Sequence, residues 1–271
     1  MSALRPSSLR PGLAVLILSC GLLGYEISLM RVLLFASWHH FAFLVVSVAL
    51  LGFGASGTAL CLAGRRLETR GEPAIFALVL LTAFSLPAAA RVAAEIPVEA
   101  RFLPALLAGQ IGMWVLYWVV WFVPFLLGAS AIGLSLVLAG ERVPTLYGLN
   151  LLGSAIGACA APVAMSFVHP QWLPVIMGGI TLAAAAALPG ARTRRGVFWA
   201  VLTGAAIALF AVAMPPKIRM DEFKYGSYVR DLVDDGLAGR EKPGQDQRRG
   251  TDCDPDRRPR GADEGPLARR E

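Results

Sequence analysis

The sequence predicts an all-α protein, a multi-pass helical membrane bundle of seven or eight transmembrane helices followed by a disordered C-terminal tail. Residues 102–140 and 143–191 contain no Asp, Glu, Lys or Arg, and charged residues make up only 16% of the chain. Soluble domains carry about 25% charged residues. A bilayer can bury such uncharged runs, because each crossing takes about 20 apolar residues wound as an α-helix.

The alternation of apolar runs and charged links gives the order of the crossings. We expect them at 13–35, 41–63, 74–90, within 102–140, at 146–168, from the turn at 169–174 to 187, and at 197–214. A signal peptide has an apolar core of only about 7–15 residues. The first run is longer, so we interpret it as a retained first crossing.

These runs divide the chain into four parts. They are a cytoplasmic N-terminal flank (1–12), a transmembrane helical bundle (13–214), the start of a soluble domain or a juxtamembrane segment (215–238), and a tail (239–271). The tail is rich in Arg, Asp, Pro and Gly, and such a segment buries too little apolar surface to offset its ordering entropy. We therefore expect it to be disordered, and the abrupt change of composition raises the hypothesis of an out-of-frame or truncated end.

The run 102–140 leaves the number of crossings open. As one straight helix it would extend about 58 Å, whereas the hydrocarbon core is about 30 Å thick. It is either one helix preceded by an interfacial segment, or two short crossings with a turn near Pro124. Loop charges do not decide, because both counts leave the larger share of Lys and Arg inside when the N-terminus is cytoplasmic.

The net charge of +6 comes from Arg and Lys in the links between apolar runs. This distribution follows the positive-inside rule, and no clustered basic face indicates nucleic-acid binding. We expect membrane lipid as a partner, no nucleic acid, and a bacterial-type inner or plasma membrane with the N-terminus cytoplasmic. The four cysteines show neither C-x-x-C nor Cys/His spacing, so no metal ligand is predicted.

Four residues make up a candidate intramembrane polar site: Glu26, His39, His40 and Asn150. Glu26 is an acid deep within a predicted span, where charged side chains are costly and mark functional sites. Arg31 lies about 140° around the same helix and does not pair with it naturally. His39 and His40 are the candidate partners of Glu26. Two interpretations remain: a polar or proton-bearing site, or a structural clamp between the first two helices.

Two glycine patterns lie inside apolar runs. Gly153 and Gly157 form a G-x-x-x-G motif, which predicts close helix packing within the chain or between two chains of a homo-oligomer. Residues 52–57 fit G-x-G-x-x-G, a dinucleotide-binding pattern when it follows a short strand. The run before it has the length of a membrane span, so we interpret these glycines as packing positions as well.

Three segments resemble membrane-bound spermidine synthase-like proteins. Residues 24–33, with Tyr25-Glu26 and a following Arg, are similar to the family's first helix. Residues 147–157 resemble its Tyr-x-x-Asn-x-x-Gly-x-x-x-Gly helix, and 123–128 resemble its Pro-x-x-x-Gly segment. Lys224-Tyr225 follows the last run roughly where the family's soluble domain begins.

The resemblance implies a membrane bundle joined to a Rossmann-like aminopropyltransferase domain, a transferase that binds decarboxylated S-adenosylmethionine and a polyamine. No segment of this chain resembles that domain, so no catalytic, cofactor-binding or metal residue is carried over. We expect the chain as given not to be catalytic and to hold no cofactor. The bundle would then serve as an anchor or handle a polyamine substrate.

Two alternatives come from other classes of protein. A stand-alone small transporter would line its path with Glu26, Asn150 and the two histidines, and interrupted helices at Pro124 and Pro162 would favour it. A structural membrane protein would instead bind a partner through the Gly153 and Gly157 face.

Overall fold

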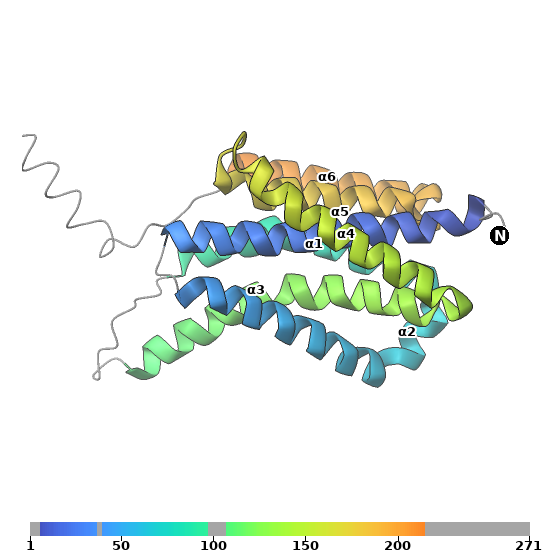
Figure 1. Cartoon of the computed structure of the whole chain (residues 1–271), viewed down its shortest axis with the longest axis horizontal. Helices are drawn as coiled ribbons and strands as arrows, with labels where there is room; N and C mark the ends of the chain where they lie inside the picture. The colour runs from blue at the N-terminus through green and yellow to red at the C-terminus, as the bar shows by residue number, and fades with distance from the viewer. Residues whose placement is uncertain (1–5, 37–39, 97–106, 215–271) are drawn as a thin grey trace, which may run out of the picture. The chain divides into compact units, whose positions relative to one another are not determined.

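The computed structural model describes residues 6–36, 40–96 and 107–214, and this part of the chain is helical with short turns (Figure 1). Six α-helices follow one another: α1 Pro6–Ala36, α2 His40–Glu95, α3 Leu107–Val137, α4 Val143–Ala164, α5 Leu173–Ala187 and α6 Arg194–Ala213. Three short 3₁₀ helices lie between the later ones: η2 Gly140–Arg142, η3 Pro170–Trp172 and η4 Pro189–Arg192. No strand occurs among these residues, and the predicted all-α class is confirmed.

Among the described residues, seven helical segments are long and apolar enough to cross a membrane. They are Arg10–Leu34, Phe43–Leu62, Thr69–Glu95, Gln110–Val137, Gly140–Met165, Pro170–Ala187 and Arg194–Ala213. The second and third both belong to α2, which bends sharply at Gly71, where φ is +47°. Glycine adopts this left-handed backbone conformation without a Cβ clash. The structure therefore supports the multi-pass membrane bundle, with seven candidate spans in the part of the chain that it describes.

The described part of the uncharged run 102–140 contributes one long helix, so of the two alternatives that the sequence left open the structure supports a single crossing. α3 continues through Pro124 without a break, and α4 likewise continues through Pro162. Membrane helices tolerate proline because neighbouring groups satisfy the backbone carbonyl that its ring leaves without a donor. The interrupted helices expected for a transport site are absent from both positions.

Several helices begin with the residues that favour a helix start. Pro144 and Pro174 lie in the first turns of α4 and α5, where a missing backbone N–H costs nothing. The hydroxyl of Thr193 caps α6 by accepting a 2.9 Å hydrogen bond from the backbone N–H of Gly196. These residues determine where the later helices begin, and therefore keep the links between the later spans short.

Successive spans alternate in direction, so the links gather at two ends of the bundle (Figure 1). The links that precede α4 and α6 lie at the same end as the start of α1, and the link between α4 and α5 lies at the other end. The first end carries exposed arginines from separate links: Arg10, Arg142, Arg192, Arg194 and Arg195. By the positive-inside rule this end would face the cytoplasm.

α1 occupies the centre of the bundle, because it contacts α2, α3, α4 and α5. Its buried side chains recur at helical spacing and include Leu18, Leu22, Tyr25 and Leu29. Lipid is as apolar as leucine, so small residues rather than hydrophobicity bring membrane helices together. Gly128 of α3 illustrates this: a Cβ there would meet Leu22 at 2.9 Å.

α6 lies at the periphery and contacts α2, α5 and η4. Its outward face exposes large apolar side chains, among them Phe198, Trp199, Leu209 and Val212. Such a face suits lipid acyl chains.

The expected terminal parts of the chain are mostly outside the described residues. These are 215–238, 239–271 and the pair Lys224-Tyr225. Helix α1 begins at Pro6, within the expected flank 1–12.

Candidate functional site

Glu26 lies within the span of α1, eight residues before the span ends at Leu34 and one residue after the fully buried Tyr25. Its side chain is half-buried. Among the residues that the structure describes, no hydrogen bond or ion pair joins Glu26 to another side chain. A carboxylate within a span that has no partner among the described residues marks a place where a cation or a hydrogen-bond donor can bind.

The expected histidine partners of Glu26 fall at the edge of what the structure covers. His39 lies outside the described residues, and His40 is the first residue of α2 but its side chain is not described. Arg31 is exposed and makes no ion pair within the described part of the chain. The pairing of Glu26 with the histidines therefore stays a prediction.

Asn150 of α4 is joined to α1, but at Ser19 rather than at Glu26. The Ser19 hydroxyl oxygen lies 2.6 Å from Oδ1 of Asn150 and 2.8 Å from the carbonyl oxygen of Val15. A hydroxyl carries one proton and can donate to only one of these acceptors. Both contacts are satisfied together when the Asn150 amide is turned over, so that its nitrogen donates to Ser19 and Ser19 donates to Val15.

Ser19 and Glu26 share one face of α1. They are seven residues apart, which places them about 10.5 Å apart along the axis and about 20° apart around it. The Asn150 amide therefore meets α1 two turns before Glu26. Of the four predicted site residues, the structure joins Asn150 to the central helix, leaves Glu26 without a partner, and describes neither histidine side chain.

Gly153 and Gly157 pack α4 directly on the backbone of α1. A Cβ at Gly153 would clash with the carbonyl oxygen of Leu16, and a Cβ at Gly157 would clash with that of Cys20. Only glycine permits so close an approach between helices. α1 therefore covers this face within a single chain.

The glycines of the segment 52–57 lie inside the second span, so no strand precedes them. A Cβ at Gly52 would meet Cβ of Phe125 at 2.6 Å, which makes Gly52 a packing position between α2 and α3. Gly54 and Gly57 face open space. This segment is not the turn that cradles a dinucleotide phosphate.

The described residues contain no group of three or more His, Cys, Asp or Glu side chains that could hold a metal ion. One ion pair occurs in this part of the chain, between Arg91 and Glu95 near the end of α2. The polar groups in the described interior include Glu26, the Ser19–Asn150 pair, the Tyr25 hydroxyl bonded to Leu86 of α2, and several hydroxyl groups bonded to their own helices.

Two features of the site were not predicted from the sequence. Ser19 was not recognised as the partner of Asn150, because the two residues lie 131 positions apart. Thr181 of α5 was also missed: it is fully buried against Gly21 of α1, and its hydroxyl has no hydrogen-bond partner in the described structure. The sequence did contain part of the information about Thr181, because Gly21 and Gly24 mark the face of α1 that packs on α5.

Compared with known proteins, the chain matches no protein-family model, no curated protein sequence and no solved structure.

Proposed function

We propose that this bundle is the membrane region of a spermidine synthase-like protein, in which Glu26 binds the cationic amine of a polyamine substrate. The role is substrate handling by a membrane-embedded anchor. The observation that carries the proposal is the state of Glu26: a half-buried acid within a span that has no hydrogen bond or ion pair in the described structure. An intramembrane carboxylate of this kind marks a site for a cation or a proton.

The segments that resemble the family meet around α1. Phe125, from the Pro-x-x-x-Gly segment of α3, lies with its ring centroid 5.9 Å from that of Tyr25. Gly157, from the segment 147–157, lies against the backbone of Cys20 and near Gly24. Motifs distant in the sequence thus form one packed unit beside Glu26, which is the arrangement expected if they arose together.

The face of α1 that carries Glu26 offers a second polar group in the Ser19–Asn150 pair. A polyamine is an extended chain with several ammonium groups, each of which donates hydrogen bonds and seeks a carboxylate or an amide oxygen. The spacing of about 10.5 Å along α1 allows two ammonium groups of one molecule to use both positions.

The transporter alternative has less support. The expected breaks at Pro124 and Pro162 are not present in α3 and α4, and interrupted helices are the usual sign of a transport site. The partner alternative through Gly153 and Gly157 is also weakened, because α1 covers that face. Any homo-oligomer would use another surface.

The test is an equilibrium binding measurement with the full chain in lipid nanodiscs and radiolabelled spermidine. We expect saturable binding to the wild type and a loss of about tenfold or more in affinity for Glu26→Gln, since hydrogen bonds to charged groups contribute about 1.5–3 kcal/mol. The matched control is Glu141→Gln, which removes an exposed acid at the end of a span.

Each outcome decides between the proposals. Equal binding by the wild type and Glu26→Gln, or no binding by either, would contradict a polyamine site at Glu26. Uptake of spermidine into proteoliposomes by the wild type would assign the chain to transport instead. Binding without uptake, lost in Glu26→Gln and kept in Glu141→Gln, supports substrate handling.

A further inference from the structure

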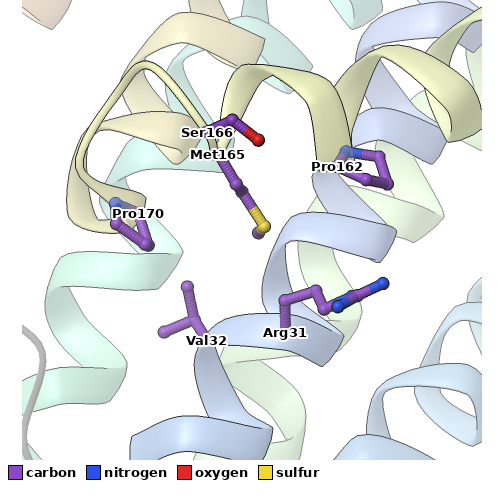
Figure 2. Close-up of a pocket in the computed structure, with 6 residues that line it drawn as sticks. All are labelled: Arg31, Val32, Pro162, Met165, Ser166 and Pro170. Atoms are coloured by element: carbon purple, nitrogen blue, oxygen red, sulfur yellow. The ribbon is translucent and has the colours of Figure 1, made fainter.

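A pocket opens where the ends of α1 and α4 meet η3. Its volume is about 260 Å³, and it is lined by Arg31, Val32, Pro162, Met165, Ser166 and Pro170. In Figure 2, the side chains of Val32, Met165 and Pro170 surround the central space, whereas the guanidinium of Arg31 extends away from that space at the pocket's edge. The lining is thus apolar, with one cation and one hydroxyl and no acid.

Arg31 has no partner in the described part of the chain. The end of α4 does not require it, because backbone N–H groups already occupy the last carbonyls: Met165 donates to Ala161 at 3.1 Å, and Ser166 donates to Val163 at 3.0 Å. Phe167 and Val168 both donate to Ala164. The guanidinium, with its five donors, is therefore free to bind a group from outside the chain.

The position of the pocket points to the membrane surface. The first span ends at Leu34, three residues after Arg31, so the guanidinium lies about 4.5 Å from that end along the helix axis. Long basic side chains near a helix end extend toward the lipid headgroups. The link that contains Ser166 and Pro170 lies at the same end.

The size of the pocket limits what it can hold. Pockets for drug-sized ligands measure about 300–1,000 Å³, so a pocket of 260 Å³ admits a headgroup but not a whole lipid. Arginine binds phosphate oxygens through two parallel hydrogen bonds. The apolar lining contributed by Met165 and the two prolines suits the first carbons of an acyl chain.

We propose that Arg31 binds the phosphate of an anionic phospholipid headgroup at the edge of this pocket, with the lipid's apolar part against Met165 and Pro170. A free phosphate ion shares the headgroup's chemistry, but the apolar lining and the membrane boundary favour the lipid. The site is separate from Glu26 and does not depend on the function proposed above.

The experiment is native mass spectrometry of the full chain released from nanodiscs that contain phosphatidylglycerol and phosphatidylcholine in equal amounts. We expect the wild type to retain phosphatidylglycerol preferentially, and Arg31→Gln to lose that preference by about tenfold or more. Arg142→Gln is the matched control, because it removes an exposed arginine from the opposite end of the bundle.

A second variant keeps the charge and fills the pocket: Val32→Trp should also reduce retention of the anionic lipid. Helix content and elution volume identify any variant that fails to fold. Equal retention by the wild type, Arg31→Gln and Val32→Trp would overturn the proposal. So would displacement of the lipid by millimolar inorganic phosphate, which would assign the pocket to a free anion.

Discussion

The hydroxyl of Tyr25 in α1 donates a 3.0 Å hydrogen bond to the carbonyl oxygen of Leu86 in α2. Both residues are fully buried. The Tyr25 ring also lies against α3, with centroids 6.4 Å from Trp121 and 5.9 Å from Phe125. One side chain therefore ties three helices together, immediately before the unpartnered carboxylate of Glu26.

Tyr25→Phe should lower the free energy of unfolding by about 1 kcal/mol, because it leaves the packing intact and removes one buried hydrogen bond. Chemical unfolding in detergent micelles, followed by helix content, measures this change. Tyr147→Phe, at an exposed position of α4, should have no effect. An equal loss in both variants would contradict a specific role for the Tyr25 hydroxyl.

Gly157→Ala should destabilise the bundle by about 1–3 kcal/mol, since the added methyl group meets the backbone of Cys20, which cannot move without shifting α1. Gly148→Ala is the control on the same helix, because a Cβ there meets nothing within 4 Å. It should change stability by no more than about 0.5 kcal/mol. Thermal unfolding of the two variants, compared with the wild type, measures these changes in stability.

Ser19→Ala and Asn150→Leu should show an interaction energy of about 0.6 kcal/mol in a double-mutant cycle, the usual value for a hydrogen bond between membrane helices. The cycle separates the Ser19–Asn150 contact from the cost of each substitution alone. Strict additivity of the two changes in unfolding free energy would show that the 2.6 Å contact contributes nothing.

Glu26→Gln should keep or raise the free energy of unfolding, although we expect it to weaken polyamine binding by about tenfold or more. A half-buried carboxylate without a partner is penalised by desolvation, and the neutral amide avoids that cost. Functional sites commonly reduce stability in this way. A marked loss of stability in Glu26→Gln would instead favour the structural clamp considered from the sequence.

Single cysteines at Glu141 and Arg192 should react with a membrane-impermeant maleimide only after cells are opened, whereas one at Ser166 should react in intact cells. All three positions are exposed, and the seven alternating spans place Ser166 at the opposite end from the other two. The measurement uses a version of the chain without its native cysteines. Labelling of Glu141→Cys in intact cells would reverse the orientation expected from the arginine distribution.

The transmembrane spans were predictable because uncharged runs of this length have no other stable location than a bilayer. The conformation of the link between the second and third spans was less predictable. Its arginines indicated a loop, yet the backbone stays helical from His40 to the break at Gly71. Arg, Leu and Glu are good helix formers, so the helix continues beyond the apolar run and ends only where glycine allows a positive φ.

The candidate site was predicted as single residues rather than as an arrangement. Glu26 and Asn150 could be selected because polar side chains in a span are costly. Their relation depends on the register between α1 and α4, which is set where Gly153 and Gly157 meet the carbonyls of Leu16 and Cys20. That register places Asn150 at Ser19, and sequence spacing alone contains no information about it.

The central position of α1 has a consequence for the order of assembly in the cell. α1 contacts α4 and α5, yet it leaves the ribosome long before them, and at about 5–20 residues per second the delay is on the order of ten seconds. During that interval the grooves at Gly21 and Gly24, later filled by Thr181 and Met177, must face lipid or the insertion machinery. Nascent chains stalled before α4 would therefore expose the part of α1 that a quality-control protease could recognise.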